Sequence, residues 1–153
     1  MSKKLQGVGI AIIVLAVARC IYRIVRVATT KGWVIQLDEK TIKQFQDQNL
    51  TPVQVNNYLK GTFITLDVIF AIFVVLVGVF AIRAAKNSAK TGALKVFAVI
   101  TIIGTVITGL RSASLPSWIS VCFAVVQLAL IICALVFASK AKKEAIPQPG
   151  QEV

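Results

Sequence analysis

Histidine is absent from this chain of 153 residues, and acidic residues number only six. Histidine is the commonest metal ligand and the side chain that titrates near neutral pH, so the usual material for metal sites and proton shuttles is missing. Asp67 is the one acidic residue inside an apolar stretch, which leaves no carboxylate pair for acid–base catalysis within the spans. We therefore expect no enzymatic activity, no cofactor and no metal.

Cysteine is also scarce and offers little chemistry. Cys20, Cys122 and Cys133 lie within apolar stretches, and no Cys-x-x-Cys pair occurs. A thiol in such surroundings is usually an inert small apolar residue. A disulfide between Cys20 and Cys122 stays open as an alternative, because both are expected in the same half of the membrane.

Long apolar runs are what the chain has in abundance. Hydrophobic residues make up 57% of it, and the mean hydropathy is +0.81, more than a water-soluble domain of this size carries. Four stretches, about 5–29, 61–83, 93–110 and 118–139, approach the roughly 20 residues that a helix needs to cross a bilayer. Because a single chain segment in lipid must satisfy its own backbone hydrogen bonds, the sequence predicts an all-α fold, an integral membrane antiparallel four-helix bundle.

The domain organisation follows from the lengths of the connections. We expect one membrane domain over 1–144, with a small helical extracytoplasmic cap over about 32–60, between spans one and two. The polar, proline-broken tail 145–153 is expected to be disordered and cytoplasmic. The first span has the basic start and the Ala16-Val17-Ala18 spacing of a signal peptide, but we interpret it as a retained span.

Basic residues are distributed unevenly between the predicted span ends. The side with both termini would hold Lys3, Lys4, Arg83, Lys86, Lys90, Lys95, Lys140, Lys142 and Lys143. The other side would hold Lys31, Lys40, Lys43, Lys60 and Arg111, diluted by Asp38, Glu39 and Asp47. Because cytoplasmic loops carry the excess of lysine and arginine, we expect both termini in the cytoplasm. The net charge of +11 is expected to meet anionic lipids rather than nucleic acid, since no separate basic domain exists.

Arginine inside the first span is the most informative feature of the sequence. Arg19, Arg23 and Arg26 are spaced by four and three residues and therefore share one stripe of a helix. Asp67 in span two and Gln127 in span four are expected at a comparable depth. We predict an intramembrane ion pair of Asp67 with Arg19 or Arg23, grouped with Gln127, which would bond to the carboxylate or to a guanidinium.

These five residues, Arg19, Arg23, Arg26, Asp67 and Gln127, are the candidate binding residues. One interpretation is structural: the polar group fixes the register of the helices, and Arg26 extends along its helix to reach the head groups. The functional interpretation is that the surplus of arginine over carboxylate recognises an anion, a lipid head group or a complementary charge on another membrane protein.

The segment between spans one and two carries clear helix signals. Asp38 is placed to cap one short helix, and Asn49 suits its end. Thr51-Pro52-Val53-Gln54 has the pattern of a capping box with proline in the first position, and the helix that it starts can run on into span two. The apolar residues here, Trp33 and Tyr58 among them, are expected to cover the outer ends of the spans, or else to dock a partner.

Span three is rich in small and hydroxylated residues. Thr101 and Thr105, Gly104 and Thr108, and Thr105 and Gly109 are pairs four residues apart, a spacing that lets helix backbones approach closely. The pattern fits packing inside one chain or a dimer interface. Threonine hydroxyls along a conduction path are a third interpretation.

Two functions remain after these observations. The leading hypothesis is an accessory or interaction subunit that binds another membrane protein or an anionic lipid. The alternative is a small oligomeric anion transporter or channel, in which the arginines select the anion.

Overall fold

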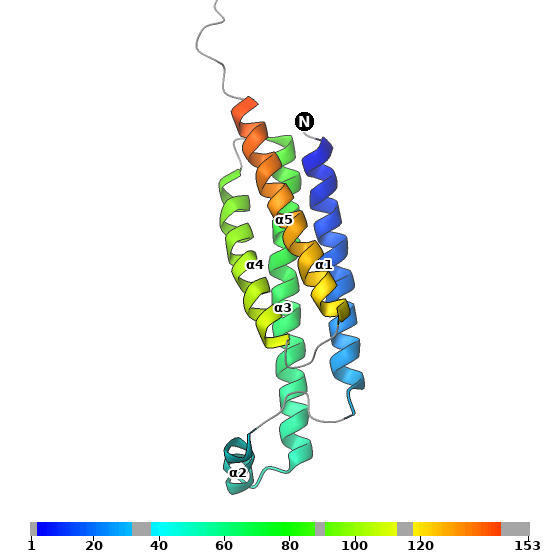
Figure 1. The fold of residues 1–153 in the computed structure, drawn as a ribbon, viewed down its shortest axis with the longest axis vertical. Coiled ribbons are helices and arrows are strands. Elements are labelled where there is room, and N and C mark those ends of the chain that lie inside the picture. Colours follow the sequence, from blue (N-terminus) through cyan, green and yellow to red (C-terminus); the bar gives the residue numbers. More distant parts are fainter. Residues whose placement is uncertain (1–2, 32–37, 88–90, 113–117, 145–153) are drawn as a thin grey trace, which may run out of the picture.

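The computed structural model describes residues 3–31, 38–87, 91–112 and 118–144, with the backbone alone for 108–112 and 143–144. Every regular element in these ranges is a helix, as the sequence predicts. In chain order they are α1 (Lys3–Thr29), α2 (Glu39–Asp47), α3 (Pro52–Lys86), α4 (Thr91–Ser112) and α5 (Trp118–Glu144). The four longer helices lie side by side, and α2 lies near the start of α3 (Figure 1).

The start of α3 confirms the predicted capping box. The Thr51 hydroxyl accepts a hydrogen bond from the Gln54 N–H at 3.3 Å, and the Gln54 side chain accepts one from the Thr51 N–H at 2.9 Å. The helix then continues unbroken for 35 residues, so span two does not begin as a separate element near 61. A lone glycine at Gly61 costs a helix only about 1 kcal/mol, which its neighbours readily offset.

Both ends of α2 are closed by hydrogen bonds of defined type. Asp38 accepts from the Thr41 N–H at 3.1 Å, as predicted for the N-terminal cap. At the other end, Asn49 has a positive φ of 57°, its N–H bonds to the Gln46 carbonyl, and the Leu50 N–H reaches the Phe45 carbonyl at 3.1 Å. These two bonds form a Schellman motif, which places Asn49 just beyond the helix.

The short helix α2 is capped but little buried. Among the described helices it contacts only α3, and none of its residues is buried. Early in α3, Val53 and Tyr58 are 68% and 75% exposed. That this segment covers the outer ends of the spans stays a prediction, and Trp33 lies outside the described residues.

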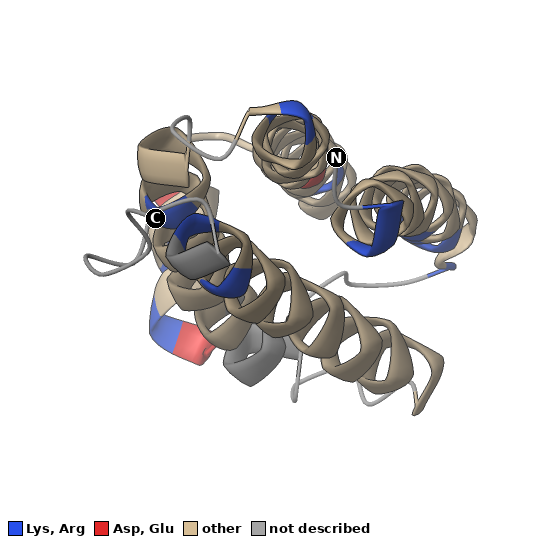
Figure 2. Cartoon of the chain, turned by 90° about the horizontal axis from the view of Figure 1, so that it is seen from above, with Lys and Arg blue, Asp and Glu red and all other residues tan. Residues whose placement is uncertain are grey.

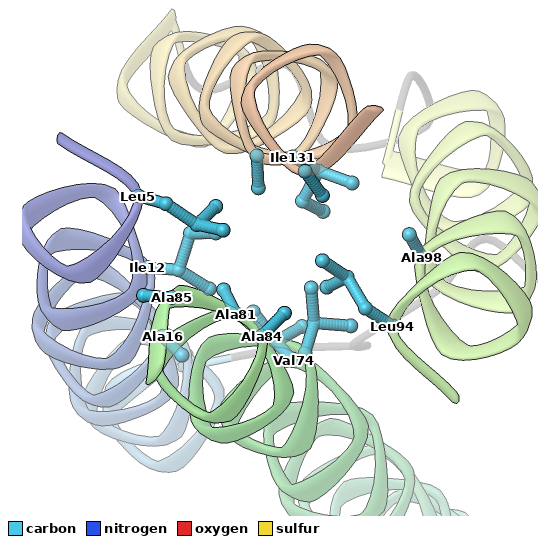
Figure 3. Packing of buried hydrophobic residues seen from close by; sticks show 13 residues of the cluster. Leu5, Ile12, Ala16, Val74, Ala81, Ala84, Ala85, Leu94, Ala98 and Ile131 are labelled. Carbon is cyan, nitrogen blue, oxygen red and sulfur yellow. The ribbon is translucent and has the colours of Figure 1, made fainter. Parts of the chain in front are cut away.

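An apolar core lies between the four longer helices. Its buried residues are mostly small, and Figure 3 shows them on the sides of the four helices that face one another. Small residues at such positions let helices approach closely. They are Leu5, Ile12, Ala16, Val74, Val77, Ala81, Ala84, Ala85, Leu94, Ala98, Ile131, Ala134 and Ala138. Each of the four helices contributes at least two of these residues, so one continuous core holds them together.

The outer surface of this assembly is apolar. On α1 the exposed residues Ile10, Val14, Val17, Ile21 and Val25 follow the face opposite to the buried one, and buried positions elsewhere hold threonine, glutamine and charged side chains. Water-soluble monomers rarely expose such continuous apolar surface.

Three helices, α1, α3 and α5, are long and apolar enough to cross a membrane, whereas α4 has a shorter apolar stretch, Thr91–Ile107. These three helices indicate a membrane protein.

Two glycines bring the backbones of α1 and α3 close together. A Cβ atom on Gly9 would lie 2.8 Å from the Gly78 carbonyl oxygen, and one on Gly78 would lie 2.7 Å from the Gly9 carbonyl oxygen. Backbone atoms cannot give way as a flexible side chain can, so any side chain here separates the helices. Gly9 and Gly78 thus set the distance between the two helices that share the most contacts.

Replacing Gly78 with Ala is expected to lower the free energy of unfolding by about 1 to 3 kcal/mol, because the methyl group overpacks a backbone contact. Reversible unfolding in mixed detergent micelles measures it. Gly7→Ala is the matched control, since a Cβ at Gly7 meets nothing within 4 Å; it is expected to leave stability unchanged or to raise it. Equal effects of both variants would contradict the close packing.

The cap of α2 is expected to depend on pH. Hydrogen bonds from Thr41, first from its hydroxyl and then from its N–H, hold the pKa of Asp38 below its ordinary value of 3.8. Since the folded form binds its proton less tightly, the cap contributes fully above 3.8 and is lost as the pH falls through the lower folded pKa. Amide exchange of Thr41 and its neighbours measures this loss. In Asp38→Asn, which caps without titrating, protection of α2 should not change over that range.

Candidate functional site

The buried face of α1 changes from apolar to basic along one stripe. Leu5, Gly9, Ile12, Ala16 and Arg19 are its buried residues, spaced alternately by four and three. Arg23 and Arg26 continue the same spacing and are partly buried. Arg19, Arg23 and Arg26, here called the arginine row, therefore point toward the other helices rather than toward lipid.

Arg19 lies deepest in the assembly, with 5% of its surface exposed. Its Nη1 donates a hydrogen bond to the Gln127 side-chain oxygen on α5, and its guanidinium carbon lies 5.4 Å from the centre of the Phe70 ring on α3. An amide oxygen and an aromatic face both stabilise a buried cation. The prediction that Gln127 accepts from a guanidinium is confirmed.

A chain of hydrogen bonds continues from Gln127 into α4. The Gln127 Nε2 donates to the Thr105 hydroxyl at 3.2 Å, and that hydroxyl donates to the Thr101 carbonyl at 2.8 Å. All three residues are buried. Arg19 is therefore connected through side chains to α5 and α4, in addition to its contact with Phe70 of α3.

Arg23 forms the predicted ion pair with Asp67. Its Nε lies 3.0 Å from each carboxylate oxygen, and the two side chains are 20% and 10% exposed. Arg19 bonds to Gln127 instead, so Arg23 is the one of the two predicted arginines that forms the ion pair. Asp67 lies at the level of Arg23, one helical turn further along α1 than Arg19.

Arg26 also bonds within the protein. Its Nη1 donates to the Ser120 hydroxyl in the first turn of α5 at 3.3 Å. The structural interpretation of the sequence predicted instead that the Arg26 guanidinium reaches the lipid head groups. Arg26 lies in the last turn of α1. The arginine row thus contacts α5 at both ends and α3 in its middle.

Gly104 of α4 makes room for the ring that covers Arg19. A Cβ atom there would lie 2.7 Å from the Phe70 ring. Thr101 and Thr105, one turn apart on the same helix, are also buried inside the chain, so these small residues pack within one chain rather than at a dimer interface. Thr108 and Gly109, the other members of the predicted pattern, lie where side chains are not described.

A lysine joins α3 to the end of α1. The Lys60 Nζ donates to the Thr30 carbonyl at 2.8 Å, and the Thr30 hydroxyl donates to the Arg26 carbonyl at 2.8 Å. A cation beside the C-terminal carbonyls of a helix complements the helix dipole. Sequence reasoning missed this contact, the contacts of Phe70 and Ser120, and the hydrogen bond from Gln127 to Thr105.

The charges of this site do not balance. The arginine row holds three positive charges, and Asp67, which pairs with Arg23, is the one acidic residue inside an apolar stretch of the sequence. Arg19 and Arg26 bond to the neutral side chains Gln127 and Ser120.

The three cysteines are free, so the alternative disulfide between Cys20 and Cys122 is not formed. Within the described ranges, no group of histidine, cysteine, aspartate or glutamate is arranged to hold a metal ion.

Comparison of this chain with protein-family models, curated proteins and solved structures finds no match. The argument for function therefore depends on the geometry and charge of the site itself.

Removing either partner of the Arg23–Asp67 pair is expected to lower the free energy of unfolding by about 1 to 3 kcal/mol, because the remaining charge stays partly buried without a counter-charge. The test compares the free energy of unfolding in mixed micelles for three variants: Asp67→Asn, Arg23→Gln and the double variant. The double variant should cost about 1 kcal/mol less than the sum of the two. Arg83→Gln, an exposed arginine on the same helix as Asp67, is the control. Strict additivity would show that the pair does not couple the helices.

Proposed function

We propose that this chain is a non-catalytic multi-pass membrane protein that acts as an accessory or interaction subunit and binds an anionic group of its surroundings, either an anionic lipid or another membrane protein. The observation that supports this proposal is the charge imbalance of the arginine row. Charge inside a membrane is costly and in most cases paired. The row has three arginines, and Asp67 is the one acidic residue inside an apolar stretch; this surplus of arginine over carboxylate favours an external anionic partner.

The proposal includes an orientation. We take the four longer helices as an antiparallel four-helix membrane bundle, with α4 as its fourth span and α2 as a small extracytoplasmic cap. Lys3, Lys4, Arg83, Lys86, Lys95, Lys140 and Lys142 are exposed, and Figure 2, viewed from the end where α1 begins and α5 ends, includes basic residues at these helix ends. The positive-inside rule then favours cytoplasmic termini.

The end of the arginine row is where an external anion has access. Arg26 lies in the last turn of α1, and Lys60 is bonded to the carbonyl of Thr30 beside it. In the proposed orientation, this pair of cations lies near the non-cytoplasmic head groups. Each basic residue near a membrane surface attracts anionic lipid by about 1 kcal/mol.

Mass spectrometry of the protein purified from its native membrane in mild detergent tests the proposal by identifying the lipids and proteins that accompany it. Arg26→Gln is expected to reduce the bound anionic lipid or partner by about fivefold, the equivalent of about 1 kcal/mol. Lys95→Gln, an exposed lysine on α4 near the opposite end, is the control and is expected to retain the partner. Equal losses in both variants would mean that binding is general surface attraction, and no associated anionic group at all would contradict the proposal.

The second candidate function is an oligomeric anion transporter or channel. Its support is that the guanidinium of Arg19 faces the interior of the assembly. The cavity beside it has a volume of about 10 Å³, about the room of one water, so a passing anion would need several chains or a large opening of the helices. Anion flux into proteoliposomes that disappears in Arg19→Gln would favour transport over the subunit role.

A further inference from the structure

A cluster of cations lies where α1 begins and α3 ends, at the end of the assembly opposite to α2 (Figure 1). Two of its members open α1, and two lie in the last turn of α3. All of them are exposed. The basic cluster, as we call it, consists of Lys3, Lys4, Arg83 and Lys86.

The packing of α1 against α3 brings these residues to one level. Gly9 of α1 lies against Gly78 of α3. Arg23, further along α1, pairs with Asp67, which precedes Gly78 in α3, so the two helices run in opposite directions. Lys4 lies about one and a half turns before Gly9, and the last turn of α3 begins about as far after Gly78. The start of α1 therefore lies beside the last turn of α3.

No described carboxylate compensates the charge of the basic cluster. None of its members forms an ion pair with another described residue, and the first turn of α1 contains no acidic residue. Of the acidic residues whose side chains the structure describes, three belong to α2 and its cap, and Asp67 pairs with Arg23. The positive charges of the cluster thus lie close together, exposed and without a counter-charge from the described part of the chain.

The helix dipole accounts for only half of the basic cluster. Arg83 and Lys86 lie at the C-terminal end of α3, where the dipole favours a cation. Lys3 and Lys4 lie at the start of α1, where the dipole disfavours one. Because these two lysines make α1 itself less stable, they favour an anionic partner outside the chain.

The basic cluster borders the apolar surface of both helices. Ile10 of α1 and Ile72 of α3 are 49% and 55% exposed, and Lys4 and Arg83 bound the apolar stretches that contain them. In a membrane, such a boundary lies at the level of the lipid head groups. A lipid beside α1 and α3 therefore has its acyl chains against the apolar surface and its phosphates against the cations.

The number of cations decides which head group fits. A lipid with one phosphodiester carries one negative charge from phosphate and leaves most of the cluster uncompensated. A second phosphate engages further cations, and the guanidinium of Arg83 is suited to hold a phosphate through two parallel hydrogen bonds. Clusters of several lysines and arginines beside membrane spans recognise lipids of this kind.

We infer that the basic cluster binds the head group of one lipid that carries two phosphate groups. The acyl chains of that lipid lie along the apolar surface that α1 and α3 share. The inference does not rest on the proposed function, because the cluster uses no residue of the arginine row and lies at the opposite end of α1 from Arg26.

Native mass spectrometry of the full chain in mild detergent tests this inference by titration with two lipids. Cardiolipin carries two phosphates, and phosphatidylglycerol, which carries one, is supplied at twice the molar concentration so that the phosphate concentrations match. The Kd for cardiolipin is expected to be about 25-fold lower, because it engages two further cations that contribute about fivefold each. Equal affinity per phosphate, or no bound cardiolipin, would overturn the inference.

Single variants then locate the site. Lys4→Gln and Arg83→Gln are each expected to raise the Kd for cardiolipin about fivefold, whereas Lys4→Arg, which keeps the charge, should retain it. Lys95→Gln is the control, since α4 has no contact with α1 among the described helices, and it should bind as the unmodified protein does. If the lysines and arginine serve only to orient the chain in the membrane, Lys4→Gln and Arg83→Gln would leave the Kd unchanged, which would overturn the inference. An equal loss in Lys95→Gln would also overturn it, as general attraction to the surface.

Pyrophosphate separates a lipid site from a site for a soluble anion, because it offers two phosphates without acyl chains. Cardiolipin is expected to stay bound when pyrophosphate is present at equal concentration, and its displacement would overturn the lipid assignment. The proposed function is tested by the partner that Arg26→Gln loses, whereas this variant should keep cardiolipin at the basic cluster. Failure of either test therefore leaves the other result standing.

Discussion

The cost of placing a guanidinium group in a water-poor interior is the constraint on which the rest of this structure depends. Three arginines on one stripe of α1 must all find polar or aromatic neighbours on adjacent helices. Gln127 and Ser120 of α5 and Asp67 and Phe70 of α3 supply them, and Thr105 of α4 completes the chain of bonds. A rotation of any one helix would strand at least one of these groups.

Different interactions hold the two halves of the α1 stripe against the neighbouring helices. Toward the N-terminus, Gly9 and the alanines of the core bring backbones together, and the attraction is dispersion between closely packed atoms. Toward the C-terminus, charges and hydrogen bonds replace this packing. Close packing fixes the distance between the helices but tolerates small sliding, whereas the polar bonds fix the register. The stripe uses both to define one arrangement in an environment that gives little hydrophobic driving force.

Local signals in the sequence predicted local structure well, and the contacts between helices only in part. The capping box at Thr51 and the cap at Asp38 were predictable because each uses atoms within four residues. The depth of Asp67 was predictable to about one turn, but its choice of Arg23 over Arg19 depends on the axial offset of α3 against α1. In the structure that offset brings Gly9 against Gly78, and the sequence does not reveal which glycines touch. Phe70 and Ser120 were missed because phenylalanine and serine occur throughout such spans and carry no signal of their own.

The unbroken length of α3 gives the molecule a mechanical property. At 1.5 Å per residue, Pro52 lies roughly 39 Å from the contact at Gly78, and Asp67 lies roughly 16 Å from it. The Lys60–Thr30 bond and the Arg23–Asp67 pair both tie this length of α3 to α1. A tilt of α3 about the glycine contact would displace Lys60 more than Asp67, because Lys60 lies further from that contact, so the bond nearer α2 resists such a tilt before the ion pair is strained.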